Sequence, residues 1–350
     1  MRLPGRAELL LLLASSLVSM LALEAAIRAG LVPLPEYVLS DGWQRERWLR
    51  ARAQEARVTK HRIDRFDPEL GWTLAPDLAG VPLNGALVHS NAAGMRGRRE
   101  YPRERGPGAR VVALGDSFTF GQCVGDDETF AARLEQRIAP GEVLNLAVHG
   151  YGHDQMLLRL RRDGLPYRPD VVLLGFYNAD VERNQLRFRD YAKPRFRVRD
   201  GALELETGEL PAPDDLAASF HLRSANYARM LRDTVFADRL KRRNKRRTEA
   251  IVRATAAEAV AAGARLALVY LPSENQVRAG RSWPQSAYKR VCGDGLALCV
   301  DPTRRLHAWL AAQPDPAAHF RCHYSPELHR EIGEEIAAAL ASAGLAALVR

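Results

Sequence analysis

Ser117 is the residue whose position most clearly suggests chemistry. It lies in the segment Gly115-Asp116-Ser117, directly after the apolar run 111–114 and before a helix predicted over 128–138. A parallel strand ends at the rim of an α/β sheet, where a tight glycine-bounded turn lifts the next side chain clear. A hydroxyl in that place can attack an acyl carbon. Asp116 and Ser117 are also common helix-capping and turn residues, so this segment alone does not decide between the two roles.

Three more candidate residues follow Ser117 at the ends of predicted elements. They are Gly150 after the apolar run 143–148, Asn178 after the run 171–174, and His323 just before a helix that ends near residue 340. Serine, glycine, asparagine and histidine thus occur in this order at successive strand or loop ends. Ordered blocks of this kind are far more specific than any one of them alone.

In this order the four blocks resemble the signature blocks of the SGNH/GDSL hydrolase superfamily. The resemblance covers roughly residues 65 to 345, and a lead-in at 67–72 and 91–97 looks like the membrane-anchored bacterial branch. It implies a three-layer α/β/α sandwich of flavodoxin-like type with a mostly parallel sheet. It also implies hydrolysis of ester bonds without a cofactor.

The resemblance assigns a role to each of the four residues. Ser117 is the expected nucleophile, and His323 is the expected base that takes the hydroxyl proton as the serine attacks. The tetrahedral intermediate carries negative charge on the former carbonyl oxygen. The expected donors to that oxygen are the backbone amides of Ser117 and Gly150 and the side chain of Asn178.

The asparagine block departs from the family pattern. The family usually has asparagine immediately before aspartate, whereas this chain has Asn178-Ala179-Asp180. Either the loop has gained a residue, or Ala179 occupies the family's asparagine position.

The histidine block departs further. The family places an aspartate two or three residues before the histidine to orient the imidazole, and those positions here are Phe320 and Arg321. Three explanations remain open. His323 works in a serine–histidine dyad oriented by a backbone carbonyl, it borrows a carboxylate from elsewhere such as Asp315, or the site is degenerate.

The other histidines are not expected to do chemistry. His149 and His153 flank Gly150 and are predicted to line the pocket or face solvent. No His or Cys spacing in the chain resembles a zinc site, so no metal is expected. Ordinary helix or loop positions are predicted for His61, His319 and His329.

The amino terminus contains an apolar segment long enough to cross a membrane. Residues 9–27 carry a single charge, Glu24, and as a helix they span about 28 Å, close to a hydrocarbon core of about 30 Å. Arg2 and Arg6 precede the segment, which favours a cytoplasmic amino terminus and an exported body. A cleaved signal peptide is the alternative, but no small-x-small site follows the run cleanly. Glu24 and Arg28 are expected to pair near the outer interface.

The length of the chain favours one core with an insertion over two equal domains. The predicted parts are a membrane anchor at 1–30, a stalk or linker at 31–64, and a hydrolase-like domain at 65–350 with an insertion at about 184–249. Inside the insertion, alternating residues around Asp200-Gly201 predict a hairpin.

The chain has 51 Lys and Arg against 42 Asp and Glu, a formal charge of +9. Much of the excess lies at 239–247, which is predicted to be a solvated helix face, with attraction to anionic lipid or acidic polysaccharide as the alternative. No nucleic-acid partner is expected of an exported chain. Four cysteines are compatible with an oxidising compartment, and the pairs Cys292 with Cys299 and Cys123 with Cys322 are both open possibilities.

Together these features predict a serine-dependent esterase, held by one transmembrane helix in a bacterial inner membrane with its site in the periplasm. The expected substrates are O-acyl groups of a cell-envelope glycan or lipid, on location and family resemblance alone. One alternative is an O-acyltransferase for an envelope polysaccharide that uses the same serine and histidine with envelope-biosynthesis partner proteins. The other is a non-catalytic carbohydrate-binding or scaffold protein with a degenerate site.

Overall fold

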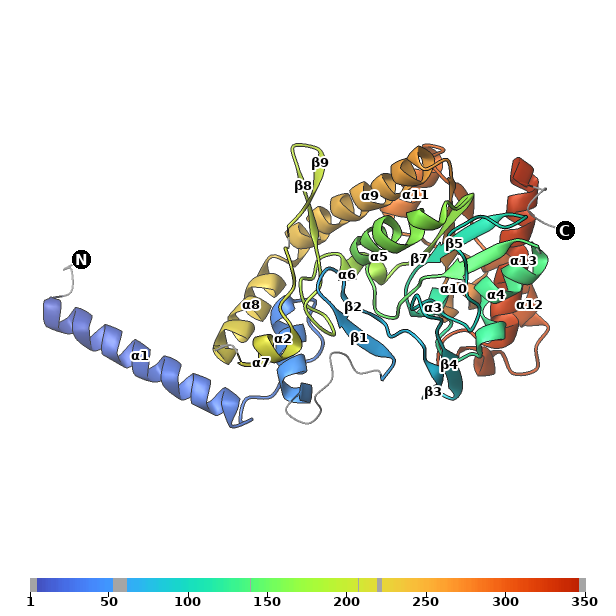
Figure 1. Ribbon diagram of the computed structural model, residues 1–350. Helices are drawn as coiled ribbons and strands as arrows, with labels where there is room; N and C mark the ends of the chain where they lie inside the picture. The colour runs from blue at the N-terminus through green and yellow to red at the C-terminus, as the bar shows by residue number, and fades with distance from the viewer. Residues whose placement is uncertain (1–4, 53–61, 139, 207, 219–221, 346–350) are drawn as a thin grey trace.

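A parallel sheet forms the centre of the protein. The computed structural model describes residues 5–52, 62–138, 140–206, 208–218 and 222–345, and within them this sheet has five strands in the order β11-β10-β7-β5-β6 (Figure 1). The strands are β5 (Arg110–Leu114), β6 (Glu142–Asn145), β7 (Val171–Tyr177), β10 (Arg265–Leu271) and β11 (Leu298–Val300). All neighbouring pairs run parallel. Numbered along the chain, the order is 2-1-3-4-5, the flavodoxin-like doubly wound arrangement.

Both faces of the sheet are buried, because alternate residues of each strand enter two separate cores. On β5, Val112 and Leu114 point to one core, and Val111 and Ala113 point to the other. The first core is closed by α5 (His153–Arg159), α9 (Ala237–Ala261) and α11 (Ser286–Gly293). The second core is closed by α4 (Phe130–Arg137), α10 (Glu274–Arg278), α12 (Thr303–Ala311) and α13 (Pro326–Leu340). The predicted three-layer α/β/α sandwich is therefore confirmed.

Two short helices follow the central strands β5 and β7. They are α3 (Ser117–Phe120) and α6 (Asp180–Arg183). In a doubly wound sheet the chain reverses its direction of winding between the first and third strands, and the crevice at their carboxyl ends is the usual place for a site. Here that crevice lies between β5 and β7.

Small antiparallel ribbons surround the sandwich. The lead-in forms β1 (Asp64–Asp67) with β2 (Gly71–Leu74) and β3 (Ala79–Leu83) with β4 (Ala86–His89). The insertion forms the predicted hairpin, β8 (Phe196–Arg199) with β9 (Ala202–Leu205). Asp200 and Gly201 turn it with φ of 50° and 81°, as a two-residue hairpin loop of this type requires.

The insertion continues as helices that lead back to the sheet. They are α7 (Pro213–Ala218), α8 (Arg223–Val235) and α9, which carries the basic run 239–247. That run is only partly the predicted solvated face, because Arg247 is buried and donates to the carbonyl of Asn184 at 3.2 Å. Arg239, Lys241, Arg242, Arg243 and Arg246 are exposed.

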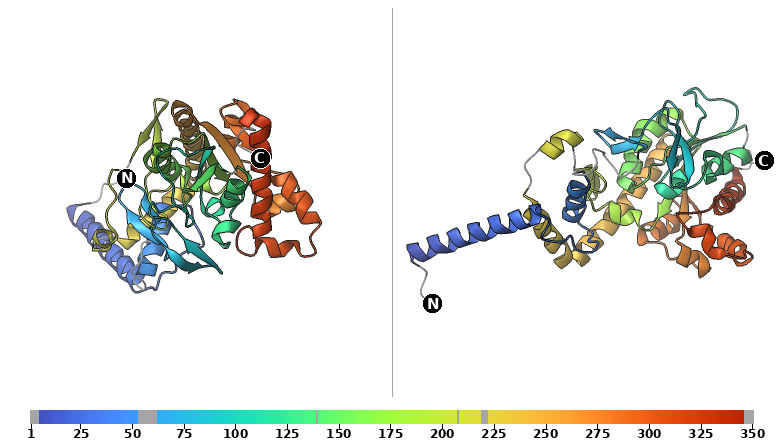
Figure 2. Two further views of the ribbon diagram at one scale, coloured as in Figure 1. Left: turned by 45° about the vertical axis from the view of Figure 1, so that its right-hand side comes forward. Right: turned by 90° about the horizontal axis from the view of Figure 1, so that it is seen from below.

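The amino-terminal helix α1 (Arg6–Arg28) projects from the body (Figure 1), and Figure 2 shows the same projection from below. It is long and apolar enough to cross a membrane, and Glu24 and Arg28 form the predicted pair at 2.7 Å. Helix α2 (Asp41–Arg52) follows and packs against α8. Glu46 of α2 pairs with Arg223, and Asn226 donates to its carboxylate at 3.3 Å. The segment predicted as a stalk thus contacts the insertion.

Candidate active site

The turn after β5 presents Ser117. Asp116 caps α3, since its carboxylate accepts a hydrogen bond of 2.9 Å from the backbone N–H of Phe118. Glycine is needed at position 115 because a Cβ there would lie 2.0 Å from Oγ1 of Thr119, which packs under the turn. Ser117 follows as the first residue of α3 and is 7% exposed. The local sequence therefore fixes the hydroxyl at the carboxyl end of the central strand.

His323 reaches the same place from the loop before α13. Its Nε2 lies 2.9 Å from Oγ of Ser117. The ring of Phe118 lies 4.6 Å from the imidazole, and the next residue, Tyr324, is buried with its hydroxyl donating to the carbonyl of Pro272 at 2.6 Å. The structure thus brings together the two residues that the sequence predicts as nucleophile and base, at the separation such a pair needs.

The other ring nitrogen of His323 faces a disulfide. Nδ1 lies 3.9 Å from Sγ of Cys123 and 3.8 Å from Sγ of Cys322, and these two cysteines are bonded to each other. Bonded sulfurs are not thiolates, so the three residues do not form a metal site. Asp315, the candidate for a borrowed carboxylate, lies 3.6 Å from the guanidinium of Arg321 and is largely exposed.

Asn178 makes its described contacts away from Ser117. Its side-chain amide donates to the hydroxyl of Tyr270 at 2.9 Å and to the carbonyl of Trp283 at 3.3 Å, and its oxygen accepts from the backbone of Gln285 at 3.1 Å. These contacts tie the end of β7 to β10 and to the loop before α11. The role of Asn178 as an oxyanion donor stays a prediction.

Gly150 has a backbone conformation that favours glycine, with φ of 79°. A Cβ at this position would also lie 2.2 Å from Nη1 of Arg189. The left-handed backbone conformation is the reason that the block needs glycine here. The expected role of its amide in the oxyanion hole is not tested by these contacts.

A buried charge cluster behind Ser117 was missed by the sequence analysis. Arg183 donates to the carboxylates of Asp116, at 2.9 Å, and of Asp180, and to the carbonyl of Tyr151 at 2.9 Å. Burial, and then the negative charge of Asp116, raises the pKa of Asp180 well above its ordinary value. The spacing of Asp180 and Arg183, three apart at the start of a helix, was the available signal.

The histidines beside Gly150 do not face solvent, and neither is among the residues that line the described cavities. His149 is 2% exposed and its Nε2 pairs with Asp64 at 2.9 Å. His153 is 1% exposed, its Nδ1 is 3.1 Å from the amide of Asn184, and burial lowers its pKa to about 3. Both rings hold the lead-in and insertion against the sheet.

Two of the three histidines predicted at ordinary helix or loop positions make structural contacts in the described part of the chain. His329 is fully buried on α13, where its Nδ1 accepts from the backbone N–H of Phe130 at 3.1 Å. His319 contacts the hydroxyl of Ser325, the capping residue of α13, at 2.9 Å. His61 lies outside the described residues.

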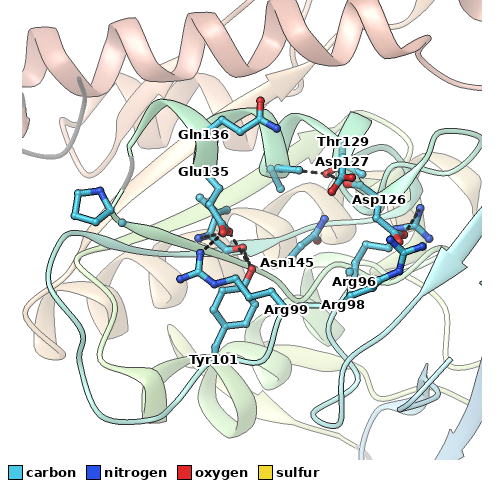
Figure 3. Close-up of a pocket in the computed structure, with 16 residues that line it drawn as sticks. Arg96, Arg98, Arg99, Tyr101, Asp126, Asp127, Thr129, Glu135, Gln136 and Asn145 are labelled. Atoms are coloured by element: carbon cyan, nitrogen blue, oxygen red, sulfur yellow. Dashed lines mark hydrogen bonds and ion pairs between the residues drawn. The ribbon is translucent and has the colours of Figure 1, made fainter. Parts of the chain in front are cut away.

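A cavity of about 730 Å³ lies beside α4 and β6, and Ser117 is not among its lining residues (Figure 3). Several of its charged and polar groups pair with one another. Arg96 lies 3.1 Å from Asp126, and Arg99 and the hydroxyl of Tyr101 both bind Glu135. The candidate chemistry therefore follows the Ser117–His323 contact rather than this cavity.

Among the known proteins, the chain matches solved structures. No protein-family model matches the chain, and no curated protein matches it. Axe2, an acetylxylan esterase from Geobacillus stearothermophilus, matches at 16% identity over 67% of this chain and 95% of its own, with a TM-score of 0.42. LAE5, an α/β hydrolase enzyme from the metagenome of Lake Arreo, Spain, matches at 16% identity over 66% of this chain and 94% of its own, with a TM-score of 0.41. A protein of the G-D-S-L family from Desulfitobacterium hafniense DCB-2 matches at 15% identity over 66% of this chain and 99% of its own, with a TM-score of 0.36.

The strand order and the position of the site agree with the order of the sequence motifs. The sheet has the 2-1-3-4-5 order, and the serine and histidine blocks meet at the carboxyl end of its first strand. In its fold and in the chain order of Ser117, Gly150, Asn178 and His323, the chain is similar to the SGNH/GDSL hydrolase superfamily.

Proposed function

We propose that the protein is a serine-dependent hydrolase of carboxylic esters. The observation that carries this proposal is the 2.9 Å separation between Nε2 of His323 and Oγ of Ser117 at the end of the central strand. An alcohol is a weak nucleophile at neutral pH, and a neighbouring imidazole activates it by accepting its proton.

The proposed reaction has two steps. Oγ of Ser117 attacks the ester carbonyl while its proton passes to Nε2 of His323, and the imidazolium then gives that proton to the departing alcohol. This leaves an acyl group on the serine. Water attacks the acyl carbon with the same imidazole as base, and the acid is released as the serine hydroxyl forms again.

The oxyanion hole is proposed to use the backbone amides of Ser117 and Gly150. Both are the donors that the family resemblance implies, and neither requires a side chain to move. The amide of Asn178 is engaged with Tyr270 and Trp283, so it would have to leave those partners to serve as a third donor. Each donor of this kind is typically worth on the order of 10²-fold or more in turnover.

The protein is proposed to remain anchored by α1 in a bacterial inner membrane, with its site in the periplasm. The end of α1 belongs to the folded body, because Ile27 is buried and Glu24 accepts hydrogen bonds from the first turn of α8. Cleavage of a signal peptide within or after α1 would remove these contacts. The two disulfides also support an oxidising compartment.

The substrates are proposed to be O-acyl esters of an envelope glycan or lipid. This class rests on the proposed location and on the family resemblance. Mass spectrometry of the mature amino terminus tests the anchor, and retention of residues 1–30 is the expected result.

The catalytic proposal is tested on the full-length protein in detergent. Wild type is expected to hydrolyse a chromogenic acetate ester without any acceptor sugar and to react with a fluorophosphonate probe. Ser117→Ala should lose both activities, whereas Ser342→Ala, which changes an exposed serine, should keep both. Wild type that never reacts with the probe would instead leave a binding or scaffold role. Ester turnover only when an acceptor sugar is added would favour the acyltransferase.

A further inference from the structure

The disulfide between Cys123 and Cys322 joins the two halves of the candidate site. The two cysteines lie 199 residues apart in the sequence, with a Cα–Cα distance of 6.4 Å. Cys123 follows α3 at the end of the serine block, and Cys322 immediately precedes His323. The bond therefore ties the loop after the nucleophile to the loop that carries the base.

The disulfide also contacts the imidazole itself. Nδ1 of His323 lies within 4 Å of both sulfurs, at 3.9 Å and 3.8 Å, while Nε2 lies 2.9 Å from the serine hydroxyl. For Nε2 to accept the serine proton, the neutral ring must carry its own proton on Nδ1. That N–H then points toward the sulfurs, which are weak hydrogen-bond acceptors. The disulfide thus lies where a group that orients the ring would act.

The loop around His323 changes from exposed to buried within a few residues. Arg321 and Cys322 are exposed, His323 is half-buried, and Tyr324 is 1% exposed. Tyr324 fixes the carboxyl-terminal side of the histidine by its hydrogen bond to Pro272. On the amino-terminal side of His323, the disulfide of Cys322 with Cys123 holds the backbone.

We propose that the Cys123–Cys322 disulfide positions His323 for catalysis. It fixes the backbone immediately before the base and packs both sulfurs against the ring edge opposite the nucleophile. This inference rests on the proposed ester hydrolase function. Its consequence is that the assembled serine–histidine pair depends on an oxidising compartment.

The protein offers a matched control for the test. Its second disulfide, Cys292–Cys299, links α11 to β11 over a separation of 7 residues. The comparison uses full-length wild type, Cys123→Ser/Cys322→Ser and Cys292→Ser/Cys299→Ser in detergent.

Fluorophosphonate titration counts the reactive sites, so that kcat is expressed per site. Loss of the first disulfide should lower kcat by about 10- to 100-fold with little change in KM, as expected when a catalytic group is displaced by about 1 Å. The control should keep the wild-type kcat.

A reductant extends the test to a chain that has already folded. In the Cys292→Ser/Cys299→Ser background, dithiothreitol converts the Cys123–Cys322 bond to two thiols and is itself oxidised to its cyclic disulfide. Thiol titration should find two thiols per chain as kcat falls. Reoxidation should restore both the bond and kcat, which irreversible damage to the protein by the reductant would not do.

The outcomes separate the two proposals. Wild type without ester hydrolysis overturns the proposed function. Active wild type whose kcat per site is unchanged after complete reduction overturns the positioning role and leaves the hydrolase proposal intact. A fall in kcat equal to that of the control variant also overturns the positioning role.

Discussion

The carboxylate of Glu24, near the end of α1, accepts a hydrogen bond of 2.8 Å from the backbone N–H of Ser224, at the start of α8. It accepts a second, of 3.0 Å, from the N–H of Arg223. The first backbone N–H groups of a helix have no partner inside it, so a carboxylate at this place acts as a cap. Here the cap comes from a segment 200 residues away. The membrane-spanning candidate is thereby joined to the insertion.

Glu24→Ala should destabilise the body of the protein. Without the carboxylate, two N–H groups of α8 lose their acceptor, and loss of a helix cap costs about 1–2 kcal/mol in free energy of unfolding. Denaturant unfolding of the full-length protein in detergent measures the change. Glu8→Ala is the matched control, because Glu8 is exposed and caps only the amino-terminal end of α1, away from α8. Equal stability of the two variants would contradict a role for Glu24 in capping α8.

Asn178→Ala should reduce stability more than turnover. The side chain holds Tyr270, Trp283 and Gln285 together, and its removal leaves partners unpaired at a cost of about 1–3 kcal/mol. Unfolding and ester hydrolysis are measured on the same preparations, with Asn275→Ala, which changes an exposed residue of α10, as control. A loss of about 10²-fold or more in kcat would instead assign this amide to the oxyanion hole.

The sandwich could be predicted because each central strand is buried on both faces and therefore appears in the sequence as a continuous apolar run. The run 111–114 lies in β5, and the run 171–174 lies in β7. The predicted helix at 128–138 begins only at Phe130, because Thr129 caps α4. Boundaries depend on such local capping choices, whereas the apolar pattern does not.

Side-chain directions within the site could not be predicted in the same way. The order of the motifs, through the family resemblance, predicted the meeting of Ser117 at the end of β5 with His323 in the loop before α13. Where the polar groups near them point depends on segments far away in the sequence. His149 turns inward to Asp64, and Asn178 turns toward Tyr270. Both partners are far away in the sequence, so the residues around His149 and Asn178 do not predict these contacts.

Replacing Arg183 should be strongly destabilising. Arg183 neutralises Asp116 and Asp180, both fully buried, so Arg183→Met leaves two carboxylates without their cation at a cost of about 3–5 kcal/mol. Adding Asp180→Asn should recover part of the loss, because one of the two carboxylates is then neutral. Arg161→Met is the control, since Arg161 pairs with Glu258 at the surface, where a pair is worth about 0–1 kcal/mol. Denaturant midpoints of the four proteins test this order.

His329 should make the protein less stable in acid. Burial, with smaller repulsions from His323 and Arg96, lowers the pKa of the His329 imidazole from 6.5 to about 3. Between these values the unfolded chain binds a proton at this residue and the folded protein does not. The free energy of unfolding therefore falls as pH drops below 6.5, and at pH 5 this residue alone should cost about 1–2 kcal/mol.

His329→Asn isolates this contribution. The asparagine oxygen can take the place of Nδ1 and accept from the backbone N–H of Phe130, but the side chain does not titrate. Denaturant unfolding of both proteins from pH 4.5 to pH 8 measures the difference. The variant should show a shallower loss of stability toward acid, while the gap between the two curves should be constant above pH 7, where the imidazole is neutral in both states. Parallel curves down to pH 4.5 would mean that the imidazole gains its proton without unfolding, and that the ring is accessible to water in the folded protein.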